Sequence, residues 1–142
     1  MKLTISITAG LSAFFLPVQG ILIAVFIAVL ADTATGIYKA KKLAKPIISK
    51  RMSDIIAKLI IYEVVVLLLF LIDHFLLQEF MKIWFSVDYF FTKLIALVVV
   101  AIELTSMKEN IEEATGLDIL KWLRSTLQRT KEIKNDVNDI IP

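Results

Sequence analysis

Residues 3–31 read LTISITAGLSAFFLPVQGILIAVFIAVLA and contain no charged side chain. A membrane-spanning helix needs about 20 consecutive, predominantly apolar residues, and this stretch is longer. The same bias extends over the chain. Of its 142 residues, 58% are hydrophobic, and the mean hydropathy is +0.77, whereas roughly 45–50% of a soluble domain is apolar. The sequence therefore predicts an all-α integral membrane protein.

Pro17 and Gly20 interrupt the first apolar stretch, so we expect two segments there. Proline lacks a backbone donor and is best tolerated in the first turn of a helix. We predict an N-terminal interfacial helix over residues 1–16 and a first span over residues 17–38. Two alternatives remain open. Residues 1–16 can cross as a fourth span, or the stretch can be a secretory signal peptide, although the apolar core of a signal peptide has only about 7–15 residues.

Two further spans are predicted, which makes about three in all. Residues 64–72 form an uninterrupted apolar block. At about 1.5 Å per residue this block cannot cross a hydrocarbon core of roughly 30 Å. The second span therefore covers residues 56–77 and includes Glu63, and the third covers residues 84–102. A buried helix of a soluble bundle is the competing interpretation of the second segment.

The charges are unevenly distributed, and their distribution predicts an orientation. Residues 39–58 contain one acidic residue, Asp54, and seven basic ones: Lys39, Lys41, Lys42, Lys45, Lys50, Arg51 and Lys58. Cytoplasmic loops carry an excess of Lys and Arg. We therefore expect a basic cytoplasmic loop at residues 39–58 and an N-terminus outside the cell. A membrane domain of residues 1–106 then precedes a cytoplasmic tail of residues 107–142.

Residues that carry chemistry are scarce. The chain has no cysteine, one histidine and four glycines. This composition excludes a disulfide scaffold, a thiolate metal site and a multi-histidine metal site. A glycine-rich phosphate loop and a nucleophile turn are also absent from the sequence. We predict a protein that is not an enzyme, needs no cofactor and binds no nucleic acid.

Four charged residues fall at a similar depth within the predicted spans. They are Asp32, Lys58, Glu63 and Glu103. A charge in hydrocarbon costs several kcal/mol unless it is paired or hydrated. We expect the four side chains to face one another, with Lys58 as the shared cation; snorkelling of each to the interface is the alternative. Asp73 lies nearer the outer end of the second span.

Two helix faces carry small or polar residues at helical spacing. The first consists of Asp32, Gly36 and Ala40, at i, i+4 and i+8. The second consists of Glu103, Ser106 and Asn110, at i, i+3 and i+7. Small residues let helix backbones approach closely in a membrane, and polar side chains form hydrogen bonds between helices. We expect both faces to contact other helices or other subunits.

The tail contains signals for one helix end and one helix start. Gly116 predicts a helix stop, and Asp118 predicts the N-cap of an amphipathic helix. The a/d positions of this helix are Leu120, Leu123, Leu127, Thr130, Lys134, Val137 and Ile141. Two polar residues among seven argue against a strong coiled coil. A partner-binding helix and a helix lying on the membrane surface both remain possible.

Three blocks of residues, in this order, carry a family resemblance. The first is D-x-x-T-G-x-x-x-A at residues 32–40, and the second is an apolar span that Lys58 opens and Asp73 closes. The third is E-x-x-S-x-x-E-N at residues 103–110, followed by Gly116. Together they resemble the phage lysis holin and toxin-secretion holin family over about residues 31–123. The chain departs from the family pattern in lacking a glycine in the linker and a proline after Gly116.

The resemblance implies a bacteriophage protein of host cell lysis. Such a protein accumulates in the host cytoplasmic membrane, oligomerises, and forms a pore or lesion that releases an endolysin or a toxin. The resemblance does not imply that the protein binds the endolysin directly. The residues that the resemblance and the spacing single out for family motif or oligomerisation are Asp32, Gly36, Ala40, Lys58, Glu63, Asp73, Glu103, Ser106, Glu109, Asn110 and Gly116. Two other functions fit the residues: a membrane anchor that recruits a partner through its tail, and a small ion channel subunit.

The intramembrane charges lead to a hypothesis about mechanism. We expect pairing among Asp32, Lys58, Glu63 and Glu103 to hold a closed or dispersed state. Oligomerisation then turns these polar faces toward a water-filled lesion.

Overall fold

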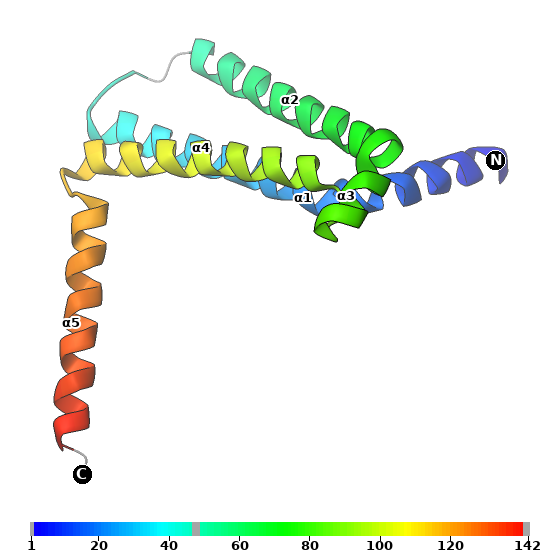
Figure 1. Ribbon diagram of the computed structural model, residues 1–142. Coiled ribbons are helices and arrows are strands. Elements are labelled where there is room, and N and C mark those ends of the chain that lie inside the picture. The colour runs from blue at the N-terminus through cyan, green and yellow to red at the C-terminus, as the bar shows by residue number, and fades with distance from the viewer. Residues whose placement is uncertain (1, 47–48, 141–142) are drawn as a thin grey trace.

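The computed structural model describes the backbone of residues 2–46 and 49–140, and the side chains of residues 9–46, 52–131 and 133. Within these residues the chain is all-helical, as predicted (Figure 1). In chain order the elements are α1 (Lys2–Lys42), α2 (Ser49–Ile72), a π-helical turn η1 (Asp73–Leu77), α3 (Gln78–Phe85), α4 (Phe90–Thr115) and α5 (Ile119–Ile140).

Three helical stretches are long and apolar enough to cross a membrane. They are Ala9–Lys42, Met52–Phe85 and Phe90–Thr115. The prediction of three spans is therefore confirmed. Helices α1 and α4 lie side by side and have the most extensive contact, and α2 packs along this pair (Figure 1).

Helix α1 is continuous, so the break expected before Pro17 is wrong. A proline inside a helix removes one backbone hydrogen bond, and a membrane helix tolerates this loss where neighbouring helices support it. Here Phe14 and Phe15 pack on Phe70 of α2, with ring centroids 5.5 and 6.0 Å apart. Val18, next to the proline, is buried. Packing on both sides of Pro17 thus holds the helix together, and the first turns of α1 project beyond the bundle (Figure 1).

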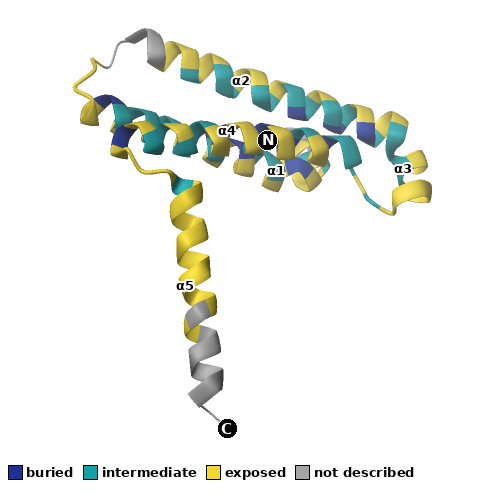
Figure 2. Cartoon of the chain, turned by 60° about the vertical axis from the view of Figure 1, so that its left-hand side comes forward, coloured by how far each residue is buried: buried dark blue, intermediate teal, exposed yellow. Residues whose placement is uncertain are grey.

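The buried core is a thin line between the helices. It consists of Val18, Val25, Val66, Phe70, Ala96 and Val99. Most large apolar side chains instead point outward, as the exposed positions along α1, α2 and α4 show (Figure 2). Lipid tails are as apolar as leucine, so a membrane bundle has no reason to bury these side chains inside. The outward apolar surface is that of a protein surrounded by lipid.

The third helix begins later than predicted. Residues 84 and 85 belong to α3, and α4 starts at Phe90. The chain reverses between them through two left-handed residues, Ser86 with φ 53° and Tyr89 with φ 55°. Neither is glycine, the residue that adopts this conformation most readily, so the sequence did not indicate where the chain reverses. The predicted start at residue 84 is therefore wrong.

The basic segment at residues 39–58 is mostly helical. Helix α1 extends to Lys42 and α2 begins at Ser49, so the connection is shorter than the expected loop. The last turn of α1 contains Lys39, Lys41 and Lys42. Cations at this position interact favourably with the helix dipole, which accounts for the extension. The side chains of Lys50 and Arg51 lie outside the described residues.

The two helix-end predictions for the tail are confirmed. Gly116 adopts φ 71°, and its N–H donates to the Glu112 carbonyl at 2.8 Å, which ends α4. The Lys121 N–H donates to Asp118 Oδ1 at 2.9 Å, so Asp118 caps α5. Helix α5 then runs away from the bundle, transverse to α4 (Figures 1 and 2). The a/d residues Lys134, Val137 and Ile141 lie outside the residues whose side chains are described.

Candidate functional site

A lysine on α2 links all three spans. Lys58 Nζ lies 3.1 Å from Asp32 Oδ2 of α1 and 2.5 Å from Glu103 Oε2 of α4. Glu103 is fully buried, and the Asp32 side chain is 14% exposed. Lys58 also lies over the Tyr62 ring, 5.9 Å from its centroid. The predicted pairing of Lys58 with Asp32 and Glu103 is confirmed, and a single ammonium group thereby holds three helices together.

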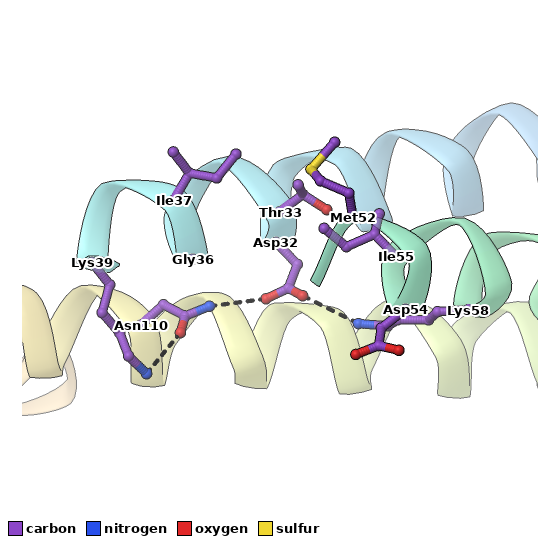
Figure 3. A pocket seen from close by; sticks show the side chains of 10 residues that line it. All are labelled: Asp32, Thr33, Gly36, Ile37, Lys39, Met52, Asp54, Ile55, Lys58 and Asn110. Atoms are coloured by element: carbon purple, nitrogen blue, oxygen red, sulfur yellow. Dashed lines mark hydrogen bonds and ion pairs between the residues drawn. The ribbon is translucent and has the colours of Figure 1, made fainter. Parts of the chain in front are cut away.

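The polar contacts continue along α1 and α4 toward the basic connection. Asn110 Nδ2 donates to Asp32 Oδ1 at 3.1 Å and to Thr35 Oγ1 at 3.4 Å. Lys39 Nζ donates to Asn110 Oδ1 at 3.0 Å (Figure 3). Lys39 also pairs with Glu113 Oε1 at 3.0 Å. We call the set Asp32, Thr35, Lys39, Lys58, Glu103, Asn110 and Glu113 the interhelical network.

The small residues of α1 lie next to this network. A Cβ added at Gly36 would lie 3.6 Å from Asn110 Nδ2, at ordinary van der Waals contact. Ala40, one turn further, is buried. The face predicted from Asp32, Gly36 and Ala40 thus includes residues that contact Asn110 of α4. Of the face predicted on α4, Asn110 contacts α1, and Glu103 pairs with Lys58 of α2.

A second polar contact lies beyond the C-terminal end of α2. Asp73 is buried, and its Oδ2 accepts hydrogen bonds from Thr92 N–H at 2.7 Å and Thr92 Oγ1 at 2.6 Å. Thr92 is in the first turn of α4, where backbone N–H groups have no partner within the helix. A carboxylate there is also favoured by the helix dipole. Asp73 therefore caps α4 from the π-helical turn and joins the end of α2 to the start of α4.

The comparison with protein families decides the class of the protein. The model of the bacteriophage holin family matches residues 9–132 of the chain. The chain belongs to this family. No curated protein and no solved structure matches it. The matched residues include the whole interhelical network. They also include Asp73, which caps α4, and α5 as far as residue 132. The chain is therefore a multi-pass, non-enzymatic membrane protein of the bacteriophage holin family.

One predicted member of the charged cluster lies elsewhere in the holin. Glu63 is partly buried on α2 and forms no ion pair or hydrogen bond with the described side chains. It is five residues from Lys58, which places it about 140° around the helix. The expectation that Glu63 faces Asp32 and Glu103 is therefore wrong.

The remaining motif residues occupy two different environments. Ser106 is partly buried and Glu109 is exposed, and both line a shallow groove on the outer side of α4. Gly116 forms the helix end described above. None of these three takes part in the interhelical network.

A pocket of about 240 Å³ opens beside the network, between α1 and the start of α2 (Figure 3). It is lined by Asp32, Thr33, Gly36, Ile37, Lys39, Met52, Asp54, Ile55, Lys58 and Asn110. A water molecule takes up about 30 Å³ in the liquid, so the pocket has room for several. Among the described residues, no group of three or more His, Cys, Asp or Glu side chains could hold a metal ion. The site is thus a charged contact between helices with space for water beside it.

Four residues of these contacts were not predicted from the sequence, and one of them is Glu113, the partner of Lys39. Lys39 was counted only as part of the basic segment, Thr35 only as part of the family block, and Thr92 was not singled out. The spacing of Lys39 and Thr35 from Asp32, at i+7 and i+3, places all three near one helix face and could have revealed two of them. Thr92 follows aromatic residues without a capping pattern, so only its position opposite Asp73 reveals its role.

Proposed function

We propose that this holin-family protein oligomerises in the host cytoplasmic membrane and opens lesions that release an endolysin or a toxin. The observation that carries the proposal is the interhelical network, in which five charged side chains link the helices of a mostly apolar bundle. A protein that only anchored a partner would have no need of these charges, because apolar side chains hold membrane helices together without their desolvation cost.

The network stabilises a single closed copy in this proposal. Removing one partner of a buried ion pair costs about 3–5 kcal/mol, since the other charge is left unpaired. Lys58 has two such partners on different helices, so α2 cannot leave α1 and α4 without exposing charge to lipid. A water-filled opening formed by several copies removes this penalty, because water solvates the same side chains. On oligomerisation, the side chains that pair within one copy then line the water-filled opening.

The orientation follows from the basic residues at one end of the bundle. Residues 39–58, which include the connection between α1 and α2, contain seven of the chain's 16 Lys and Arg residues and one acidic residue, so we place this end in the cytoplasm. The N-terminus is then outside, and the segment after Gly116 is cytoplasmic. Residues 107–115 continue α4, so we place the border between membrane domain and tail at Gly116. The functional partner is an endolysin, which leaves through the lesion and need not bind the protein.

The test is induced expression in bacteria, with and without an endolysin that lacks a signal peptide. Membrane potential, a cytoplasmic reporter enzyme in the medium and culture turbidity are followed together. We expect abrupt loss of potential, and then lysis only when the endolysin is present. Continued growth with an intact potential, despite confirmed membrane insertion, would contradict the proposal and favour an anchor. Loss of potential without passage of any folded protein would favour an ion channel.

A further inference from the structure

Helix α5 has one apolar side along the part whose side chains are described. At about 100° per residue, its large apolar residues fall within an arc of roughly 160°. They are Ile119, Leu120, Trp122, Leu123, Leu127 and Ile133. The other residues within the arc are Thr126 and Thr130, and no charged residue of 119–131 lies there. All but Ile119 among the six are exposed, so the structure leaves an apolar helix face without a cover.

The rest of the helix surface is basic over the same length. Residues 119–131 contain Lys121, Arg124, Arg129 and Lys131, and no acidic residue. All four cations are exposed and lie outside the apolar arc. The acidic residues of α5 begin only at Glu132. The half of the helix nearest the bundle therefore combines an apolar side with a uniformly positive polar side.

The attachment of α5 keeps this surface next to the membrane. Only residues 116–118 separate it from α4, which is a candidate span up to Thr115. The Ile119 N–H donates to Glu112 Oε1 at 3.0 Å, which ties the first residue of α5 to the end of the span. Beyond this point α5 runs transverse to α4, away from the bundle (Figures 1 and 2). Where α4 crosses the membrane upright, a helix transverse to it lies parallel to the membrane surface.

We propose that residues 119–131 of α5 form a binding surface for anionic phospholipid, with the apolar arc inserted at the head-group boundary and the four cations among the lipid phosphates. An amphipathic helix with Lys and Arg on one side and Trp and Leu on the other binds membranes in this way. The charge complementarity selects this occupant. A second copy of α5 lying parallel to the first would bring four more cations against the first four, whereas an anionic lipid surface attracts each of them. Tethering by α4 raises the local concentration of the helix at that surface.

The test uses the full chain reconstituted in vesicles, with Trp84→Phe so that Trp122 is the sole tryptophan. Vesicles of phosphatidylcholine are compared with vesicles of which about a third is phosphatidylglycerol. We expect the Trp122 emission to shift to the blue in the anionic vesicles. Quenching by acrylamide should fall at least about threefold there, and brominated lipid should quench the emission. High salt should reverse part of the change, because the attraction is electrostatic.

A pair of matched variants separates charge from helix content. Arg124→Glu with Lys131→Glu should abolish the dependence on phosphatidylglycerol, whereas Arg124→Lys with Lys131→Arg should preserve it. Circular dichroism of each variant in the same vesicles verifies that the helices are intact.

Two results would overturn the inference. One is an equal exposure of Trp122 in both kinds of vesicle. The other is a protection that ignores lipid charge and rises with the ratio of protein to lipid, which would assign the surface to a second copy. The measurement needs no lesion, so it remains interpretable even if the proposed lytic function fails.

Discussion

At the scale of single residues, one lysine forms ion pairs with two carboxylates. Lys58 lies within ion-pair distance of both Asp32 and Glu103, and Glu103 is fully buried. Its second oxygen, Oε1, has no hydrogen-bond partner among the described residues. A buried carboxylate with so few partners depends on its one ion pair. Replacing Lys58 should therefore destabilise the bundle more than replacing any other residue of the network.

Lys58→Met should therefore destabilise the closed bundle. We expect a loss of about 3–5 kcal/mol, because Glu103 keeps its charge without a partner. In induced cells the onset of depolarisation should come earlier than in the wild type. The time from induction to loss of membrane potential, at equal protein level in the membrane, measures this effect.

Glu63→Gln is the matched control for Lys58→Met. Glu63 is an intramembrane charge on the same helix that does not belong to the interhelical network, so the timing should stay close to that of the wild type. A further variant, Asp32→Asn with Lys58→Met and Glu103→Gln, removes all three charges together and should recover most of the lost stability. An unchanged onset in Lys58→Met would refute the proposed role of the network.

Asp73→Ala should loosen the start of α4. The change removes the acceptor for Thr92 N–H and Oγ1, and loss of a helix cap costs about 0.5–2 kcal/mol. Thr92→Val should cost less, because the backbone hydrogen bond to Asp73 remains. Thermal unfolding of the detergent-solubilised protein compares the two variants. Equal losses would mean that the backbone contact contributes nothing and that Asp73 is not a cap.

At the scale of elements, helix ends decide how α4 and α5 are joined. Gly116 ends α4 in the left-handed region at φ 71°, where a side chain is strained. Asp118 then starts α5 by accepting the Lys121 N–H. The two residues together let the chain leave the direction of α4 within a very short connection.

Gly116→Ala should consequently destabilise the junction by about 1 kcal/mol. Gly20→Ala provides the control, because Gly20 lies inside α1 with nothing within 4 Å of an added Cβ. Alanine is the better helix former, so this second change should be neutral or stabilising. Limited proteolysis at residues 116–118 and thermal unfolding both report the difference. A cost at Gly20 equal to that at Gly116 would show that the left-handed conformation is not the cause.

At the scale of the whole molecule, the three spans and α5 differ in their surfaces, and we expect them to differ in function. The three spans contain the interhelical network and face lipid over most of their surface. Helix α5 runs away from the bundle, and none of its described side chains belongs to the buried core. Permeabilisation should then reside in the spans, and α5 should adjust how the protein sits on the membrane.

Deleting the residues after Gly116 should for this reason preserve lysis with a co-expressed endolysin. The onset should shift, since the truncated protein lacks the basic surface of α5. Culture turbidity and release of a cytoplasmic enzyme measure both properties, with membrane fractionation to confirm equal insertion. Complete loss of permeabilisation in a stably inserted truncation would instead support the anchor interpretation.

The sequence alone was enough to predict features that depend on neighbouring residues. The hydropathy of each segment predicted a membrane protein with three spans, because transfer into lipid depends on local composition. Gly116 and Asp118 predicted a helix end and a helix start, since caps are satisfied within one turn. The charges within the spans predicted an ion pair at Lys58, because an unpaired charge in lipid is too costly.

Only the tertiary structure decided which side chains meet. Rotation of α2 about its axis brings Lys58 to Asp32 and Glu103 and turns Glu63 away from them. Packing of aromatic rings keeps α1 helical through Pro17, against the expectation of a break. The contact of Asp73 with Thr92 depends on the turn between α3 and α4, which brings two residues that are 19 positions apart in the chain together. These features depend on how the helices are rotated and packed against one another. Contacts between residues far apart in the chain determine this packing, so local sequence does not reveal it.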